Sequence, residues 1–383
     1  MLNKLKRIDW VIVGILLVFS VFSPLVIYSA TYGGDPSFAN TAMKTVVFFA
    51  AGFVIMFATA LFDYRILLKI WPITLGVTVL LLVGIFFFGS NLNGAIGWYN
   101  FGAFSFQPAE IAKIALIFAL AQLLGRRGGD PLTFTKDLVP VALVTLVPFT
   151  LVVVQPDLGN AIIYIVIFIG MLWIGGIKLR HVLIGLVAVS LLAGSVYVSF
   201  TTFREETKAF FTDVVKQQHW FTRIDTFINP SLASDDANHQ SKYAMIAIGS
   251  GGLSGDGYMK GELKRRSFIP YTYSDAIFVV IGEEFGFQGS SILLLLYFLL
   301  IYRMILIAFQ CYDMRGSYII IGIVSMFVFQ ILENIGMMIG LMPVTGITLP
   351  FISYGGTSLL LNMFCIGLVM SIRIYQEKYQ LED

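Results

Sequence analysis

The sequence has little charge and very little cysteine. Asp, Glu, Lys and Arg make up only 13% of the 383 residues, whereas a soluble domain has roughly 25%. Hydrophobic residues make up 57%, and the mean hydropathy is +0.84. A soluble globular protein is therefore excluded, and we expect a chain embedded in a membrane.

Other absences narrow the class further. The two cysteines, Cys311 and Cys365, lie in or near apolar segments, so no disulfide framework is expected. The formal charge of +2 gives no basic field of the kind that nucleic acid requires, so no nucleic-acid partner is expected. The three histidines lack metal-ligand spacing, no Gly-x-Ser-x-Gly elbow occurs, and the glycine-rich stretch lacks P-loop spacing. A zinc site and acyl transfer by serine are therefore not expected.

Apolar runs of about 20 residues, the length that crosses a bilayer as a helix, recur along the chain. They predict an all-α polytopic membrane protein with ten transmembrane helices in a single domain, 1–383. The basic residues before the first run are followed by no small-residue cleavage site, so this run is expected to be a span and not a signal peptide. The expected spans are 9–29, 42–62, 67–88, 107–125, 138–154, 158–176, 181–201, 288–309, 317–340 and 356–373.

The charges of the connections predict the orientation. Lys and Arg occur in both tails and in every second connection. The intervening short connections contain none, and they are 30–41, 89–106, 154–157 and 341–355. By the positive-inside rule, both termini are expected to be cytoplasmic and these connections to face outward.

The seventh and eighth expected spans are joined by a long connection, about 202–287, which must also face outward. A structureless connection of that length is uncommon and usually functional. Its sequence QSKYAMIAIGSGGLSG predicts an amphipathic helix at the outer membrane interface, ended by glycines.

Two polar motifs near the outer face allow two interpretations each. Glu110 and Lys113 are three residues apart on one helix face and can pair, either to hold helices together or to contact substrate in a water-filled cavity. Asp157 lies in the tightest outward turn, where it can cap the sixth span or contribute to a site.

Two further outward segments are rich in donors or in irregular backbone. The long connection carries Arg223, Gln240 and Lys242 together with a glycine stretch, a combination that suits phosphate or pyrophosphate. The segment Gly340–Ser358 is dense in Pro and Gly and is expected to form one wall of a site.

Three carboxylates, Asp275, Glu283 and Glu284, stand at the start of the eighth apolar run. The run has enough length from Gly289 onward to cross the membrane, so the preceding residues are expected to form a short outer-leaflet helix, broken or kinked near Gly286 or Gly289. At about 100° per residue, neither glutamate can share a reacting atom with Asp275. We expect both glutamates to have supporting roles, by pairing with loop cations or capping backbone.

Several motifs occur in a fixed order along these spans: FQPAEIAK, QPDLGNA, QSKYAMIAIGSGGL, SDAIFVVIGEEFGF, NIGMMIGLMPVTG and LPFISYGGTS. With these motifs the chain closely resembles, over nearly its whole length, the SEDS family of bacteria, which comprises RodA, FtsW and SpoVE. The sequence KRIDW before the first span is more similar to RodA than to FtsW.

The resemblance implies a peptidoglycan glycosyltransferase that polymerises lipid II on the outer face of the bacterial cytoplasmic membrane. It implies as partners a class B penicillin-binding protein that crosslinks the glycan, other elongation or division proteins, and membrane lipids. Whether elongation, division or sporulation is served stays open.

The resemblance also implies residue roles. The family's essential aspartate falls on Asp275, and its important Glu and Lys fall on Glu110 and Lys113. Many members have Arg where Gly97 stands here, so that phosphate contact must come from elsewhere. The other expected substrate-binding residues are Trp98, Gln107, Asp157, Arg223, Gln240, Lys242, Ser250, Gly251, Gly252, Ser353, Tyr354, Gly355 and Gly356.

The expected chemistry needs one base. Lipid II carries an α-linked pyrophosphate and the polymer bond is β-1,4, so the transfer inverts the anomeric carbon. Pyrophosphate can leave without a general acid if cations hold its charge. A divalent cation, Mg²⁺ or Mn²⁺, would suit it, but no constellation in the sequence fixes metal ligands. The alternatives are a flippase or transporter of the lipid-linked precursor, which would need polar groups through both leaflets, and a non-catalytic morphogenetic scaffold.

Overall fold

The computed structural model describes most of the chain. The described residues are 6–32, 38, 40–92, 95–100, 105–128, 130–215, 218–229, 235–261 and 272–375.

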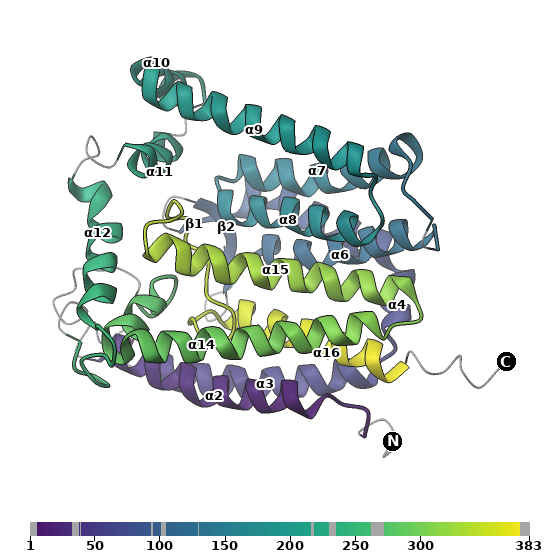
Figure 1. Ribbon diagram of the computed structural model, residues 1–383, viewed down its shortest axis with the longest axis horizontal. Helices are drawn as coiled ribbons and strands as arrows, with labels where there is room; N and C mark the ends of the chain where they lie inside the picture. Colours follow the sequence, from purple (N-terminus) through teal and green to yellow (C-terminus); the bar gives the residue numbers. More distant parts are fainter. Residues whose placement is uncertain are drawn as a thin grey trace.

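Long helices lie side by side with roughly parallel axes and form a bundle (Figure 1). Each of the predicted spans coincides with one of these helices. They are α2 (Trp10–Thr31), α3 (Thr41–Leu61), α5 (Trp71–Phe88), α6 (Pro108–Gly125), α7 (Val139–Val154), α8 (Leu158–Ile174), α9 (Leu179–Thr202), α14 (Ile277–Phe309), α15 (Met314–Met338) and α16 (Gly356–Tyr375). Two short helical elements, α4 (Tyr64–Lys69) and η2 (Phe134–Leu138), precede α5 and α7.

Within the described residues, 9 helices are long and apolar enough to cross a membrane, when η2 and α7 are counted as one helix, Phe134–Val154, of 21 residues. The exception among the predicted spans is α8, which is apolar but has only 17 residues. At 1.5 Å per residue it is about 25 Å long, slightly less than the hydrocarbon thickness of about 30 Å. The membrane-spanning fold is therefore confirmed, while the count of ten spans stays a prediction.

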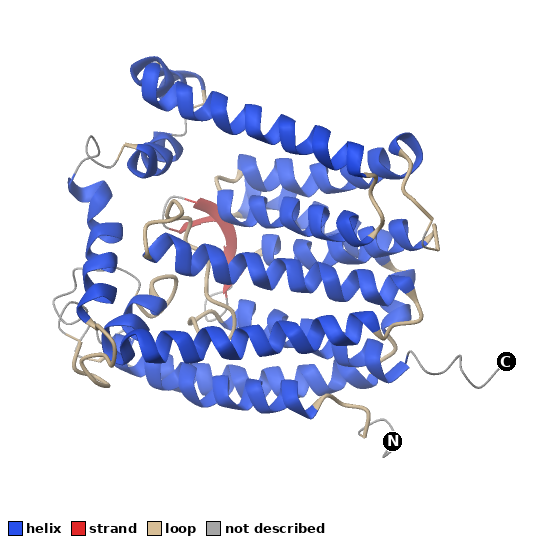
Figure 2. Cartoon of the chain, in the orientation of Figure 1, coloured by secondary structure: helices blue, strands red, loops and turns tan. Residues whose placement is uncertain are grey.

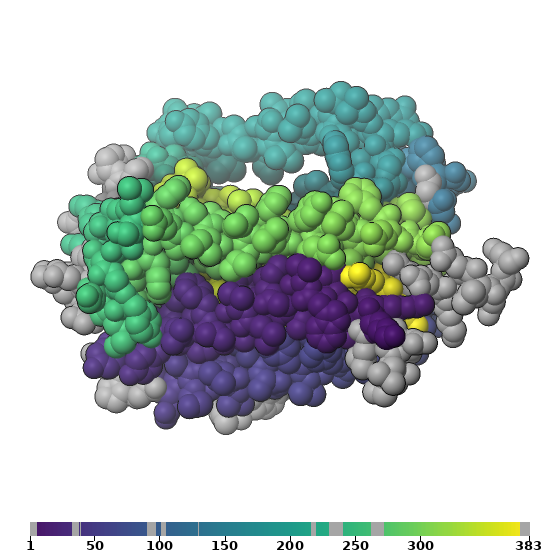
Figure 3. Space-filling view, turned by 60° about the horizontal axis from the view of Figure 1, so that its bottom comes forward, coloured from purple at the N-terminus to yellow at the C-terminus, as the bar shows by residue number. Residues whose placement is uncertain are grey.

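The centre of the bundle contains α6, α15 and α16. Most side chains of α6 are buried, because its small and branched apolar residues face neighbouring helices on all sides. By contrast, α9 stands apart from the bundle (Figure 3), and Phe200 is its single buried residue. The exposed apolar side chains of α9 therefore suit contact with lipid along its whole length.

The two ends of the described chain lie at the same end of the bundle (Figure 1). Arg7 Nη1 donates to the Ile374 carbonyl over 3.4 Å, so the N-terminal segment is tied directly to α16. This placement agrees with two termini on one side of the membrane. Which side they face stays a prediction.

The opposite end of the bundle holds the connections that are predicted to face outward. A small antiparallel sheet, β1 (Ser90–Leu92), β2 (Ala95–Asn100) and β3 (Ser105–Phe106), lies there (Figure 2), which the all-α prediction missed. Tyr99 anchors it by donating from its hydroxyl to the Leu81 carbonyl over 2.9 Å.

The long connection is largely helical within its described residues. It contains α10 (Arg204–Ala209), η3 (Phe210–Val214), α11 (Gln218–Ile228) and α12 (Asp235–Ser250). α12 crosses the end of the bundle at a steep angle to the long helices (Figure 1), as a helix in the membrane interface would. The predicted helix that ends at glycines is confirmed, because α12 stops at Ser250 and Gly251 follows.

α14 is broken near its beginning, as the sequence predicts. Gly286 has a φ of 62° and a ψ of −158°, which are not helical. The preceding part is wrapped by residues 251–257: Asp256 N and Gly257 N each donate over 3.0 Å to the carbonyls of Glu283 and Glu284. In return, Phe287 N and Gln288 N donate to the carbonyls of residues 252 and 253 over 2.9 and 3.0 Å.

Candidate functional site

One carboxylate occupies the turn that leads into α14. Asp275 precedes the helix, and its Oδ1 atom is buried and accepts no hydrogen bond from the described residues. Burial raises the pKa of this carboxyl to about 6, although backbone N–H groups and the charge of Arg223 act in the opposite direction. A half-buried aspartate with such a pKa suits proton transfer near neutral pH.

Asn334 of α15 fixes the position of this turn. Its Nδ2 atom donates to the carbonyls of Asp275 and Ile347, each over 2.7 Å. Tyr354 N donates to the Tyr273 carbonyl over 3.0 Å, and the two tyrosine rings meet edge to face. The Pro- and Gly-rich segment after α15 is thereby packed directly against the Asp275 turn.

The predicted pair on α6 is confirmed. Lys113 Nζ lies 2.8 Å from Glu110 Oε1, and the lysine side chain is 1% exposed. Tyr164 of α8 donates from its hydroxyl to the Ala109 carbonyl over 2.9 Å, which holds the first turn of α6 in place. The ion pair is therefore a largely buried element of the bundle, close to the end opposite the termini.

The predicted capping role of Asp157 is also confirmed. Its carboxylate accepts hydrogen bonds from Asn160 N over 3.1 Å and from Asn160 Nδ2 over 2.8 Å. Gln107 Nε2 donates to the same carboxylate over 2.6 Å, so two of the predicted site residues are in direct contact. The cap leaves open whether Asp157 also contacts substrate.

Sequence reasoning missed Glu333, which belongs to the same polar region. This residue of α15 is 2% exposed, and its Oε1 accepts a hydrogen bond from Thr345 Oγ1 over 2.7 Å. The charges of Asp157 and Lys113 act on it, and its neighbour Asn334 binds the carbonyl of Asp275. The available signal was an acidic residue inside an apolar span, directly before a Pro- and Gly-rich segment.

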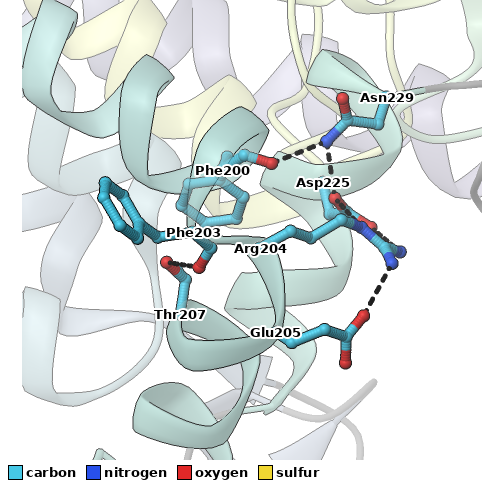
Figure 4. Close-up of polar contacts among 7 residues, drawn as sticks. All are labelled: Phe200, Phe203, Arg204, Glu205, Thr207, Asp225 and Asn229. Atoms are coloured by element: carbon cyan, nitrogen blue, oxygen red, sulfur yellow. Dashed lines mark hydrogen bonds and ion pairs between the residues drawn. The ribbon is translucent and has the colours of Figure 1, made fainter.

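Arg223 is carried by α11, whose position depends on a polar network with α9 and α10 (Figure 4). Arg204 at the start of α10 forms a bidentate pair with Asp225, with contacts of 3.0 and 2.7 Å. Asn229 binds both Asp225 and the Phe200 carbonyl, over 2.8 and 3.0 Å. These contacts hold α11 against the C-terminal end of α9, and the charge of Arg223 lowers the pKa of Asp275, against the larger effect of burial.

Gln240 and Lys242 lie on α12, which packs against α14. The Gln240 Nε2 atom is buried without a hydrogen-bond partner among the described residues, and Lys242 is exposed. No described contact joins either residue to Asp275. Their substrate contacts stay predictions.

The expected phosphate-binding glycines have a packing role in this structure. A Cβ at Gly251 would lie 2.0 Å from the Gly282 carbonyl oxygen, so only glycine allows this approach to α14. Gly252 accepts the hydrogen bond from Phe287 N, and Ser250 donates to its own helix at Ala247 O over 2.8 Å. Substrate contact by these three residues stays a prediction.

The remaining predicted residues shape the walls of this end. Ser353 is buried and accepts from Leu349 N over 2.8 Å, which folds the LPFISY segment back on itself. A Cβ at Gly356 would lie 2.5 Å from the Phe48 ring, whereas Gly355 contacts only its local neighbours. Trp98 lies in β2 and is half-buried.

The two glutamates that follow the Asp275 turn, Glu283 and Glu284, pack against other parts of the chain. Ser29 of α2 donates from its hydroxyl to Glu284, with distances of 2.7 and 2.9 Å to the two carboxylate oxygens. A Cβ at Gly261 would lie 2.6 Å from Glu283 Oε2, so the backbone at Gly261 packs closely on that carboxylate. The sequence did not indicate Ser29 as a partner.

A cleft of about 410 Å³ lies on the outer side of this region, between α9, α10, η3 and α11. Aromatic side chains of Phe200, Phe210 and Phe211 line it together with Ile224, which adjoins Arg223 in sequence. The cleft is mostly apolar and open.

Together the fold and this site define a multi-pass helical membrane protein with a polar, partly unsatisfied site at one end of its bundle. The family model described as "Cell cycle protein", which covers FtsW, RodA and SpoVE, matches residues 4–378. The chain therefore belongs to the FtsW/RodA/SpoVE family, and it is a multi-pass bacterial membrane protein, as the sequence motifs predicted.

Named relatives and a solved structure agree with this assignment. The chain is 32% identical to stage V sporulation protein E of Bacillus subtilis, over 98% of this chain and 99% of that protein. It is 34% identical to peptidoglycan glycosyltransferase MrdB of Escherichia coli K12, over 95% of this chain and 92% of that protein. It is also similar, with a TM-score of 0.78 and 29% identity, to a chain from a peptidoglycan synthase complex whose structure concerns the coordination of polymerization and crosslinking; 97% of this chain and 99% of that chain are covered.

Proposed function

We propose that this chain is a peptidoglycan glycosyltransferase, an enzyme that polymerises lipid II into β-1,4 glycan strands with Asp275 as the general base. The observation that carries the proposal is the half-buried Asp275 carboxylate, whose Oδ1 is buried without a donor among the described residues and whose pKa is raised to about 6. The names of the relatives support the same reaction class.

The proposed reaction gives Asp275 the role of the base. The acceptor 4-hydroxyl donates its hydrogen bond to Asp275 and loses its proton to the carboxylate as the oxygen attacks the anomeric carbon of the donor. The bond to undecaprenyl pyrophosphate breaks on the opposite face, which inverts the anomeric configuration. A carboxyl with a pKa of about 6 is a stronger base than an ordinary aspartate and is still ionised at neutral pH.

The leaving pyrophosphate needs positive charge or donors near Asp275. Arg223 is the described cation whose charge acts on Asp275, and we propose that it stabilises the departing pyrophosphate. Lys113 with Glu110, and Gln107 with Asp157, orient the substrate from the α6 and α8 side. The remaining predicted substrate-binding residues complete these contacts.

A divalent cation on the pyrophosphate is not held by a protein cage in the described part of the chain. No group of three or more His, Cys, Asp or Glu side chains there is arranged to bind a metal. Mg²⁺ commonly binds through substrate phosphates with few protein ligands, so Mg²⁺ or Mn²⁺ would enter with the substrate. No step of the proposed reaction uses a metal ligand from this chain.

The proposed setting is the bacterial cytoplasmic membrane, with both termini cytoplasmic and the site facing outward. A class B penicillin-binding protein is the proposed crosslinking partner, because the similar solved chain belongs to a peptidoglycan synthase complex. The membrane-tethered substrates meet in two dimensions, which reduces the entropy cost of bringing donor and acceptor together.

The test is polymerisation of lipid II by the purified full-length chain, with and without the transpeptidase partner. Wild type is expected to make glycan strands, and Asp275→Asn is expected to make none. Asp213→Asn, which changes an exposed carboxylate of η3 in the same connection, is the matched control and should polymerise normally.

Other outcomes identify the alternatives. Translocation of lipid II across liposomes without polymer would identify a transporter. Growth that is unaffected by Asp275→Asn, with partner binding intact, would identify a scaffold. Normal polymerisation by Asp275→Asn would refute the assignment of the base.

A further inference from the structure

Glu333 is a buried carboxylate that the proposed reaction does not use. It is 2% exposed, and its Oε2 atom accepts no hydrogen bond from the described residues. A carboxylate in such a place costs free energy and is uncommon without a role. Its described hydrogen bond is the one from Thr345 Oγ1, over 2.7 Å, which ties α15 to the segment that follows it.

The residue after Thr345 faces the catalytic carboxylate. Gly346 has a φ of 81°, in the left-handed region that favours glycine, and a Cβ built on it would lie 3.6 Å from Asp275 Oδ2. The absence of a side chain at Gly346 therefore leaves this flank of the Asp275 carboxylate, beside Oδ2, open to a ligand. Glu333 acts on this space through the neighbouring residue, Thr345.

The other side of the same turn is held by the residue next to Glu333. Asn334 donates to the carbonyls of Ile347 and Asp275, each over 2.7 Å. Two consecutive side chains of α15 thus fix both flanks of Gly346. One of them also fixes the backbone of Asp275.

We infer that Glu333 is a positioning residue, which fixes the 345–347 turn through Thr345 so that Gly346 keeps room beside Asp275 for the acceptor hydroxyl. The inference rests on the proposed glycosyl transfer. It assigns Glu333 no contact with the reacting atoms, and its role is to hold the geometry of the base.

The electrostatic surroundings make a pH readout informative. Arg223 of α11 is the described charged group that acts on Asp275, while Lys113 of α6 and Asp157 at the start of α8 act on Glu333. If the turn loosens, water reaches Asp275 and its burial decreases. The pKa of Asp275 should then fall, and the acid limb of the rate profile should move to lower pH.

The closing experiment compares Thr345→Val with wild type in lipid II polymerisation. Valine keeps the shape of threonine but removes the donor to Glu333, so kcat should fall roughly tenfold to a hundredfold because of misplacement at the base, with KM for lipid II changed less than about twofold. The acid limb should move to lower pH. Thr345→Ser keeps the donor and should restore most of kcat.

Two further variants separate positioning from a general loss of packing. Thr145→Val makes the same change at a buried threonine, whose hydroxyl donates over 2.9 Å within its own helix α7, and should leave kcat and the pH profile unchanged. Glu333→Gln keeps an acceptor for Thr345 and should lose less activity than Glu333→Met.

Each result decides between the hypotheses. If wild type makes no glycan, the proposed function fails. If wild type polymerises and Thr345→Val matches it in kcat and pH profile, or loses only thermal stability, the positioning role of Glu333 is refuted while the proposed function stands.

Discussion

The two ends of the bundle both bury charge, but they differ in how that charge is satisfied. At the end with the termini, Asp9 caps α2 and its Oδ1 accepts from Val11 N and Ile12 N over 3.1 and 3.4 Å. Its Oδ2 is bound by Arg303 of α14, at 2.5 Å, and by Arg373 of α16. Three spans are thus joined through one carboxylate with both oxygens bound.

At the opposite end, several buried side-chain acceptors have no hydrogen-bond partner among the described residues. Asp275 Oδ1, Glu333 Oε2, Asn334 Oδ1 and Asn160 Oδ1 are buried and have no hydrogen-bond partner among the described residues. Buried polar atoms in folded proteins are nearly always paired, so a concentration of unpaired acceptors indicates a place where another molecule supplies donors. A sugar, with its many hydroxyl groups, has this chemistry. The comparison sets a fully bound carboxylate, Asp9, against two carboxylates that each have an unbound oxygen, Asp275 and Glu333.

The largest expected effect is a loss of kcat at the end of the bundle that holds Asp275. Asp275→Asn removes the base and should lower kcat by about 10²- to 10⁴-fold, while the melting temperature in detergent stays the same or rises, because a buried charge is removed. Single-turnover polymerisation and a thermal melt on the same preparation measure both. A folded variant with more than a tenth of wild-type kcat would contradict the comparison.

At the end with the termini, Asp9→Asn should lower the stability of the fold and leave kcat unchanged. It leaves Arg303 and Arg373 without their shared counter-charge, so unfolding should become easier by about 3 kcal/mol. Activity per folded molecule should be unchanged. A loss of kcat in protein that is still folded would show that the two ends are coupled.

Ser29→Ala tests a carboxylate at the outer end that does have a donor. The serine hydroxyl contacts both oxygens of Glu284 over 2.7 and 2.9 Å, and removing it should cost about 2 kcal/mol of stability. Denaturation of the purified variant measures the loss. Ser195→Ala, at an exposed serine of α9 that donates within its own helix, is the control and should change stability little.

The smallest expected effect is a pH dependence. Because burial raises the pKa of Asp275 to about 6, kcat should fall about tenfold for each pH unit below this value and level off above it. The sign for stability is the reverse: the folded state binds the proton more tightly, so the contribution of Asp275 to stability decreases as pH rises from about 4 to about 6. Asp9→Asn should show the same fall of kcat at low pH as wild type. A kcat that does not change between pH 5 and 7 would exclude Asp275 as the titrating base.

The sequence predicted the elements of this site better than their contacts. Apolar length and charge alternation located the helices, and helix periodicity predicted the pairing of Glu110 with Lys113. Gly286 was predicted to break α14 because the apolar run from Gly289 already had the length of a span. These properties depend on residues close together along the chain.

Contacts between distant segments could not be predicted in this way. Gln107 meets Asp157 and Ser29 meets Glu284 only after the bundle assembles, and no local pattern encodes those pairs. Glu333 was passed over because one acid inside a long apolar segment changes its hydropathy little. The small sheet was missed because its strands are short and its turns glycine-rich.

The break in α14, which residues 251–257 surround, affects the orientation of Asp275. A helix broken at the membrane edge leaves carbonyl and N–H groups unpaired, and each would cost several kcal/mol in lipid. Residues 251–257 supply two N–H donors and two carbonyl acceptors at that point. The backbone hydrogen bonds that the helix loses at Gly286 are thus replaced by bonds to this loop. The loop, and not the span, therefore sets the direction of the first turns of α14. Inserting a residue at Leu253 should displace the Asp275 carboxylate, while the span beyond Gln288 keeps its place.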